Sequence, residues 1–159
     1  MTETMVTPDL NAITCEIDIA VPPERIFRAL TDSTELAKWF TNEECPTKYW
    51  RMDARKGGRY SYQTVQSTKV KVNGVDMFHC EGEITEFDPP RVLAYTWIAN
   101  WHDNKNMATT VRWELTHTRS GTHVKVTHSG LASEKVARDD YRGGWPGVVE
   151  KLKAFVEGH

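Results

Sequence analysis

The amino-acid sequence predicts an α+β domain in which an antiparallel sheet packs against a long C-terminal helix. Several segments alternate apolar and polar side chains, which is the period of a half-buried strand. Asn73-Gly74 separates two such segments and is typical of a tight hairpin turn, because both positions of a type I′ turn have positive φ. Towards the C-terminus the apolar residues change to helical spacing. Hairpins join antiparallel strands, and the helix supplies the cover that an apolar sheet face needs.

The composition predicts one globular domain. The chain has 159 residues, of which 39% are hydrophobic and 26% are charged. We expect residues 1–11 to form an N-terminal tail and residues 12–159 to form the domain. Lysine and arginine number 20 against 22 acidic residues, so no basic surplus favours nucleic acid as a partner. We also expect no membrane span, because no apolar run is long enough.

The cysteine content indicates a reducing compartment. Three cysteines without CxxC spacing argue against a disulfide framework. The first residues lack both the cationic start and the apolar run of a signal peptide. We therefore expect a cytoplasmic protein.

The first predicted strand covers residues 13–21, where every second side chain is apolar. Two short helices are predicted after it. Pro23 suits the first turn of one helix. Ser33 suits the N-cap of the next, which carries Trp39 on its buried face.

About six further strands are predicted, which gives a sheet of about seven. Their alternating segments cover residues 60–72, 78–84, 91–99, 109–117 and 122–128. Short polar turns separate most of these segments, so we expect neighbouring strands to pair in hairpins.

The pattern is helical from Ser133 to the end, with a predicted break at Gly143-Gly144. Pro146 predicts that the last helix begins close to it, because proline suits a first turn and resists a helix interior. A stripe at helical spacing faces the sheet, and it comprises Trp145, Val148, Val149, Leu152, Phe155 and Val156.

Several stretches together resemble one known family. They are VPPERIFRALTDSTELAKWF, DARKGGRYSY, GEITEFDPPRVLAYTW, WELTHTRSGTHVKVTHSG and GGWPGVVEKLKAFV. Residues 12–156 are similar to the activator of heat-shock protein 90 ATPase homologue family (C-terminal type). This family belongs to the SRPBCC superfamily, which is START-like and related to polyketide cyclases and the birch pollen allergen.

The resemblance implies a helix-grip fold, in which a curved antiparallel sheet wraps around the C-terminal helix and often leaves a ligand cavity. The family motifs fall on Gly144-Trp145, Asp53 to Gly58 and Pro89-Pro90, and they serve backbone geometry rather than catalysis. The eukaryotic co-chaperone has a further N-terminal domain, whereas the match here is to the single C-terminal-type module. Members of the superfamily bind lipids, cyclise polyketides, sequester antibiotics or assist chaperones.

Motifs for metal binding and catalysis are missing. The six histidines are scattered and no HExxH occurs, so we expect no metal site and no cofactor. Cys45 lies beside two glutamates, which oppose thiolate formation, and no GxSxG motif is present. We therefore assign no catalytic residue.

Aromatic side chains stand out at positions that should face the helix. They have two interpretations, a packed core or the amphipathic lining of a ligand pocket. His128 and Asp140 are candidates for a polar contact there, although either also fits the surface. The predicted ligand-binding residues are Trp39, Tyr60, Tyr62, Phe78, Tyr95, Trp97, Val111, Trp113, Val126, His128, Trp145 and Val149.

Three functions follow from these observations. The leading hypothesis is a binding module for a small lipophilic or aromatic molecule between sheet and helix. One alternative is a polyketide cyclase-like enzyme, for which His128, Tyr60 and Tyr95 are candidate acids or bases. The other is a co-chaperone-like protein-interaction module that contacts a chaperone. An apolar segment at residues 99–108 is a candidate surface for a homodimer.

Overall fold

One curved antiparallel sheet and three helices make up the fold. The computed structural model describes residues 2–158; Met1 and His159, the outer limits of the predicted tail and domain, lie outside the described residues. The strands are β1 (Glu3–Val6), β2 (Ala12–Ile19), β3 (Thr47–Met52), β4 (Arg59–Thr64), β5 (His79–Asp88), β6 (Val92–Ala99), β7 (Thr109–Thr118) and β8 (Gly121–Ser129). The helices are α1 (Pro23–Thr31), α2 (Ser33–Trp39) and α3 (Lys135–Glu157).

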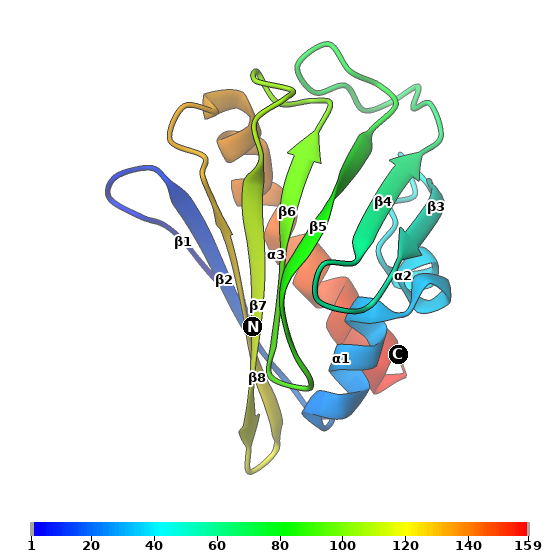
Figure 1. Ribbon diagram of the computed structural model, residues 1–159, viewed down its shortest axis with the longest axis vertical. Helices are drawn as coiled ribbons and strands as arrows, with labels where there is room; N and C mark the ends of the chain where they lie inside the picture. Colours follow the sequence, from blue (N-terminus) through cyan, green and yellow to red (C-terminus); the bar gives the residue numbers. More distant parts are fainter. Residues whose placement is uncertain (1, 159) are drawn as a thin grey trace.

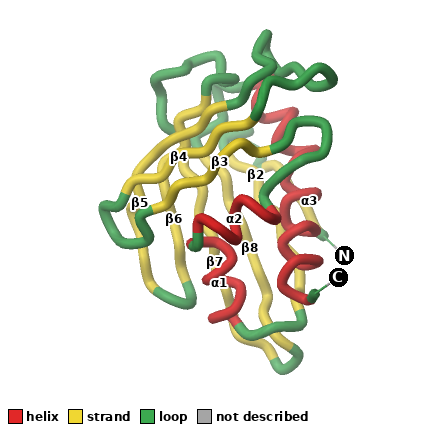
Figure 2. Tube along the Cα trace, turned by 90° about the vertical axis from the view of Figure 1, so that its right-hand side faces the viewer, coloured by secondary structure: helices red, strands yellow, loops and turns green. Residues whose placement is uncertain are grey.

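The eight strands lie in the order β1-β2-β8-β7-β6-β5-β4-β3. α3 crosses behind the central strands in Figure 1, and Figure 2 shows the helices gathered on one side of the sheet. This arrangement confirms the predicted α+β helix-grip fold.

Two edge strands carry no clear sequence signal. Glu3–Val6, inside the segment assigned to a tail, pairs with β2 in antiparallel register. Its side chains are mostly exposed, so apolar and polar residues do not alternate there. β3 forms the opposite edge and pairs with β4 through a register shift between Thr47 and Tyr49. The sheet therefore has eight strands where the pattern indicated about seven.

The predicted hairpin turn is confirmed at Asn73 and Gly74, whose φ angles are 51° and 80°. Val72 and Val75 exchange two backbone hydrogen bonds of 2.9 Å around it. The strand before the turn ends earlier than predicted, at Thr64, whereas β5 begins at His79 and extends beyond the predicted end to Asp88. The turn thus lies at the tip of a long loop.

The start of α2 differs from the prediction by one residue. Asp32 is the N-cap, and its carboxylate accepts a hydrogen bond of 3.0 Å from the Glu35 backbone N–H. Ser33 is the first helical residue, and its Oγ accepts from the Met52 backbone N–H at 2.9 Å. This contact joins α2 to the edge strand β3.

The prediction that the last helix begins near Pro146 is wrong. α3 is continuous from Lys135, and Pro146 lies inside it. A proline here removes the bond to the carbonyl of Arg142 four residues earlier. Two features make the proline tolerable inside the helix. Arg142 is exposed, so water can hydrogen-bond its carbonyl, and Gly143 has no side chain that could clash with the proline ring.

Trp145 anchors α3 to the sheet. It is 3% exposed, and its Nε1 donates to Nδ1 of His128 at 3.2 Å. Since Nδ1 accepts, the proton of the neutral imidazole lies on Nε2, which donates to Thr109 Oγ1 at 2.8 Å. That hydroxyl donates in turn to the Trp97 carbonyl at 3.0 Å. The Trp145 and Trp113 rings also meet edge-on at 5.8 Å between centroids, so the indole is fixed by both a hydrogen bond and a ring contact.

The sheet has a tight contact at Gly82 in β5. A Cβ at this position would lie 2.0 Å from the carbonyl oxygen of Thr96 in β6. That oxygen accepts a hydrogen bond of 2.6 Å from the Tyr60 hydroxyl, which reaches it from β4. The Thr96 Oγ1 accepts from the Glu83 backbone N–H at 2.9 Å. Only glycine leaves room for this cross-strand arrangement.

Gly82→Ala should destabilise the fold by about 1–3 kcal/mol, because the new methyl group overlaps a carbonyl that cannot move freely. Tyr60→Phe should cost about 1–3 kcal/mol by removing the hydroxyl that donates to the partly buried Thr96 carbonyl. Urea unfolding measures both. Gly143→Ala, where a Cβ meets nothing within 4 Å, is the matched control. Equal stability of Gly82→Ala and the natural protein would contradict the tight contact.

Two histidines should give the stability opposite dependences on pH. Burial lowers the pKa of His128 well below its ordinary value. As pH falls below about 6.5, His128 binds a proton in the unfolded chain but stays neutral in the folded chain. The free energy of unfolding therefore decreases by up to about 1.4 kcal/mol per pH unit. His128→Gln should flatten the fall in stability between pH 7.5 and 5.5.

His123 provides the comparison. Its ring nitrogens meet Glu16 at 2.9 Å and Asp18 at 2.8 Å, and these carboxylates raise its pKa. Its contribution is present below the unfolded pKa and is lost as pH rises through the folded pKa. His123→Gln should therefore steepen the loss at acid pH in urea titrations. The same slope for both variants would refute the assignment.

Candidate functional site

A pocket of about 440 Å³ lies where α3 passes the ends of α2, β4 and β6. Its size falls in the range of about 300–1,000 Å³ that is usual for small-molecule sites. The lining is mostly apolar and aromatic, and its residues are Trp39, Phe40, Thr41, Asn42, Cys45, Tyr62, Thr64, Val70, Val72, Phe78, Trp97, Trp101, Asp140, Tyr141, Gly143, Gly144, Trp145, Gly147, Val148 and Lys151.

The predicted binding residues divide between this pocket and the core. Those that line the pocket are Trp39, Tyr62, Phe78, Trp97 and Trp145. The others are buried in the core outside the lining, and they are Tyr60, Tyr95, Val111, Trp113, Val126, His128 and Val149. The sheet alternation identified the face but not the position along it, because α3 fills most of that face.

Aromatic rings form two groups along the pocket. At one end, Phe40 meets Tyr62 at 5.7 Å between ring centroids. At the other end, Trp101 lies 5.4 Å from Phe78 and 6.2 Å from Tyr141. All three distances are typical of tilted and edge-on ring pairs, so the aromatic side chains that line the pocket also pack against one another.

Three of the eight α3 residues that line the pocket are glycines. Gly143, Gly144 and Gly147 all line it, and a Cβ at any of them would meet nothing within 4 Å. None of the three has a positive φ, so the helix backbone does not require glycine. Glycine inside a helix costs about 0.5–1 kcal/mol relative to alanine. Their effect is to leave volume that side chains would otherwise occupy.

Buried polar groups close the end near Tyr141. Its hydroxyl accepts from Trp97 Nε1 at 2.8 Å and shares a hydrogen bond of 2.7 Å with His102 Nε2. Burial raises the pKa of Tyr141 well above its ordinary value and lowers that of His102. Among the described residues, His102 Nδ1 and Trp101 Nε1 have no hydrogen-bond partner. At the other end, burial raises the pKa of Tyr62 to about 12.

The loop that carries Trp101 is held by a buried carboxylate. Glu134 is 1% exposed and accepts hydrogen bonds from the backbone N–H groups of Asp103 at 2.7 Å and Asn104 at 2.9 Å. Asn73 at the hairpin tip donates to the Asp103 carboxylate at 2.7 Å. The two loops that form this wall of the pocket are therefore tied together.

Sequence reasoning missed Trp101 and the glycine face. Within the candidate dimer segment at residues 99–108, Trp101 is 6% exposed and His102 is fully buried, whereas residues 103–107 are exposed, and the homodimer stays a prediction. Gly144 and Gly147 are three residues apart and therefore lie on one face of α3. Because the sequence predicts that the helix only begins near these residues, this shared face is not evident from the sequence pattern. Asp140 and Lys151 share that face, at four residues before and after this pair.

The candidate acids and bases are held inside the core. None of His128, Tyr60 and Tyr95 lines the pocket. The Tyr95 hydroxyl accepts from Trp113 Nε1 at 2.9 Å, and burial raises the pKa of both tyrosines far above the neutral range. The hydroxyl and imidazole groups of these three residues serve internal hydrogen bonds.

Two features are absent from the described part of the chain. Residues 2–158 hold no group of three or more histidine, cysteine, aspartate or glutamate side chains placed to bind a metal ion. No helix within the same residues is both long and apolar enough to cross a membrane.

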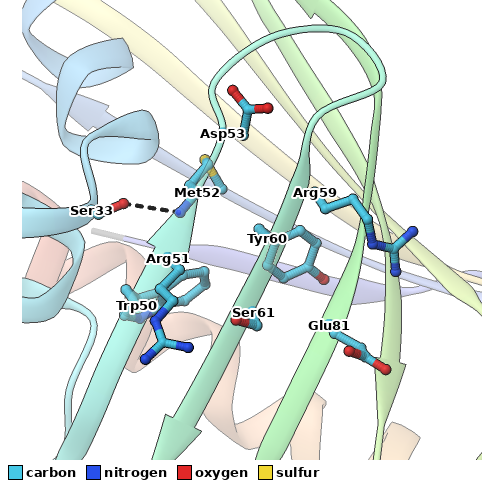
Figure 3. A pocket seen from close by; sticks show the side chains of 9 residues that line it. All are labelled: Ser33, Trp50, Arg51, Met52, Asp53, Arg59, Tyr60, Ser61 and Glu81. Atoms are coloured by element: carbon cyan, nitrogen blue, oxygen red, sulfur yellow. Dashed lines mark hydrogen bonds between the residues drawn. The ribbon is translucent and has the colours of Figure 1, made fainter.

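A second pocket, of about 630 Å³, lies on the outer side of the β3–β4 hairpin (Figure 3). Arg51, Ser61 and Glu81 stand side by side there on three neighbouring strands. Its full lining is Ser33, Trp50, Arg51, Met52, Asp53, Arg59, Tyr60, Ser61 and Glu81. Exposed charges of both signs dominate this depression, so the smaller aromatic pocket is the better candidate for a ligand.

Solved structures share the fold over nearly the whole chain. A crystal structure of a protein from Rhodobacter sphaeroides has a TM-score of 0.80 at 16% identity, and the match covers 99% of each chain. A protein from Chromobacterium violaceum has a TM-score of 0.75 at 23% identity, covering 92% of this chain and 98% of that one. The AHSA1-like protein from Aeromonas hydrophila has a TM-score of 0.71 at 23% identity, with 92% of each chain covered.

No curated protein gives a match to this sequence. The family model described as Activator of Hsp90 ATPase homolog 1-like protein matches residues 20–157. The predicted resemblance is thereby confirmed, and the chain belongs to this family.

Proposed function

We propose that this protein binds a small lipophilic or aromatic molecule in the 440 Å³ pocket beside α3. The family and the fold support the broader class of a ligand-binding or co-chaperone-like module. The narrower assignment rests on the chemistry of the pocket lining.

The glycines of α3 carry this proposal. Gly144 and Gly147 line the pocket together with aromatic side chains, and a Cβ at either position would meet nothing within 4 Å. Glycine at these positions lowers helix stability, and the backbone conformation does not require it. Gly143, Gly144 and Gly147 are exposed, so the pocket opens to solvent along α3, and the aromatic rings opposite them forgo the dispersion contacts that side chains would supply. A bound apolar molecule supplies those contacts in place of side chains.

A co-chaperone role is the second candidate, and family membership is the observation that favours it. It needs an exposed protein-binding surface and gives the glycine-lined pocket no part. The two functions therefore respond differently to substitutions that fill the pocket.

Gly144→Ala and Gly147→Leu should raise the stability of the protein by about 0.5–1 kcal/mol each and at the same time weaken ligand binding. The stability gain comes from helix propensity, and the loss of binding comes from filled volume. Thermal melts measure the first. Fluorescence of N-phenyl-1-naphthylamine, a neutral probe that emits in apolar surroundings, measures the second.

Arg142→Leu is the matched control, since this exposed residue of α3 lies outside the pocket lining. It should leave probe binding unchanged. A natural protein that neither binds the probe nor gains thermal stability from a panel of sterols, fatty acids and polycyclic aromatics would refute the proposal, because a ligand at a hundred times its dissociation constant stabilises by about 2.7 kcal/mol.

A further inference from the structure

We propose that the molecule bound in this pocket is a cationic amphiphile, an apolar body that carries a protonated amine paired with the carboxylate of Asp140. This inference rests on the proposed function, because it names the chemical class of ligand for the same pocket.

The pocket lining contains one carboxylate and one ammonium group among the described residues, Asp140 and Lys151. Both belong to the glycine face of α3. They are eleven positions apart in the helix, which corresponds to about 16 Å along its axis. A ligand between them therefore meets opposite charges at its two ends.

The carboxylate of Asp140 has no hydrogen-bond or ion-pair partner among the described residues. Its neighbour Asp139 shows the contrast, because that carboxylate pairs with Lys135 Nζ at 2.8 Å. Although Asp140 is exposed as a whole residue, surrounding protein atoms raise the pKa of its carboxyl group by desolvation. A carboxylate that gives up water without gaining a partner is costly, and a cation offsets this cost.

The ring faces near Asp140 favour the same charge. Tyr141 is the next residue of the helix, and its ring lies 6.2 Å from Trp101, which also lines the pocket. The faces of tyrosine and tryptophan attract cations, most strongly where water is excluded. An ammonium group that pairs with Asp140 would enter a pocket whose lining includes both of these rings.

The opposite end does not offer the same opportunity to an anion. Lys151 Nζ already donates a hydrogen bond to the Thr41 carbonyl, and the residue is exposed to water. Asp140 and Lys151 are both exposed, so solvent and salt screen both charges. The difference is that Lys151 Nζ has a hydrogen-bond partner, whereas the Asp140 carboxylate has none among the described residues.

The test compares three probes with the same aromatic body, 2-(1-naphthyl)ethylamine, 2-(1-naphthyl)ethanol and 3-(1-naphthyl)propanoate, by calorimetric titration at low ionic strength. The amine should bind about tenfold more tightly than the alcohol, as expected for one charge-assisted hydrogen bond. Asp140→Asn should remove this preference while the alcohol binds as before. Asp139→Asn, which makes the same charge change one residue away, should retain it.

Each alternative result overturns the inference in a recognisable way. Equal binding of amine and alcohol overturns the cation preference and leaves the proposed function intact. Tighter binding of the propanoate, lost in Lys151→Met, overturns it in favour of an anionic ligand. Binding of none of the three probes overturns this inference, and if N-phenyl-1-naphthylamine also fails to bind, the proposed function falls with it.

Discussion

The hydrogen bond that fixes Trp145 against the sheet determines the orientation of α3, and the position of the pocket depends on that orientation. Its indole N–H is fixed by His128, and the imidazole is fixed in turn through Thr109 to the backbone of β6. A buried tryptophan held by a directional bond sets the rotation of the helix about its own axis. Once that rotation is set, Gly144 and Gly147 are turned towards the pocket.

The same anchor explains why the pocket lies at one end of the sheet. From Trp145 onwards, α3 packs Val149, Leu152 and Val156 closely against the strands. Gly143, Gly144 and Gly147 lie beside the buried stripe that continues through Tyr141, so the aromatic side chains at this end of the sheet face an incomplete wall. Polar residues near this end, including His102 and Glu134, hold the loop with Trp101 in place rather than filling the space.

The fold was predictable from the sequence because its signals are local and strong. Alternation along residues 13–21 and the Asn73-Gly74 dipeptide each identify a structure from a few neighbours. The edge strand at Glu3–Val6 was not predictable, because its side chains are mostly exposed and show no alternation, and because it forms only by pairing with β2. The helix start predicted near Pro146 is wrong because helix propensity describes isolated helices. In the folded protein, tertiary packing keeps α3 continuous through this proline.

The candidate site was predictable only in part. Inward positions such as Tyr62 and Trp97 follow from period two, and they do line the pocket. Tyr95 and Trp113 obey the same rule but lie in the core, because alternation does not say where along a strand the helix stops filling the space. Trp101 comes from a loop with no period at all. Its position depends on hydrogen bonds to residues far away in the sequence.

The central claim is that the glycine face of α3 leaves apolar space beside Trp145. Crystallography under xenon pressure tests it most directly, because xenon enters empty apolar cavities without needing a specific ligand. We expect ordered xenon between Gly144, Gly147 and the rings of Tyr62 and Trp101. An empty difference map, with those rings closed down onto the glycines, would contradict the account.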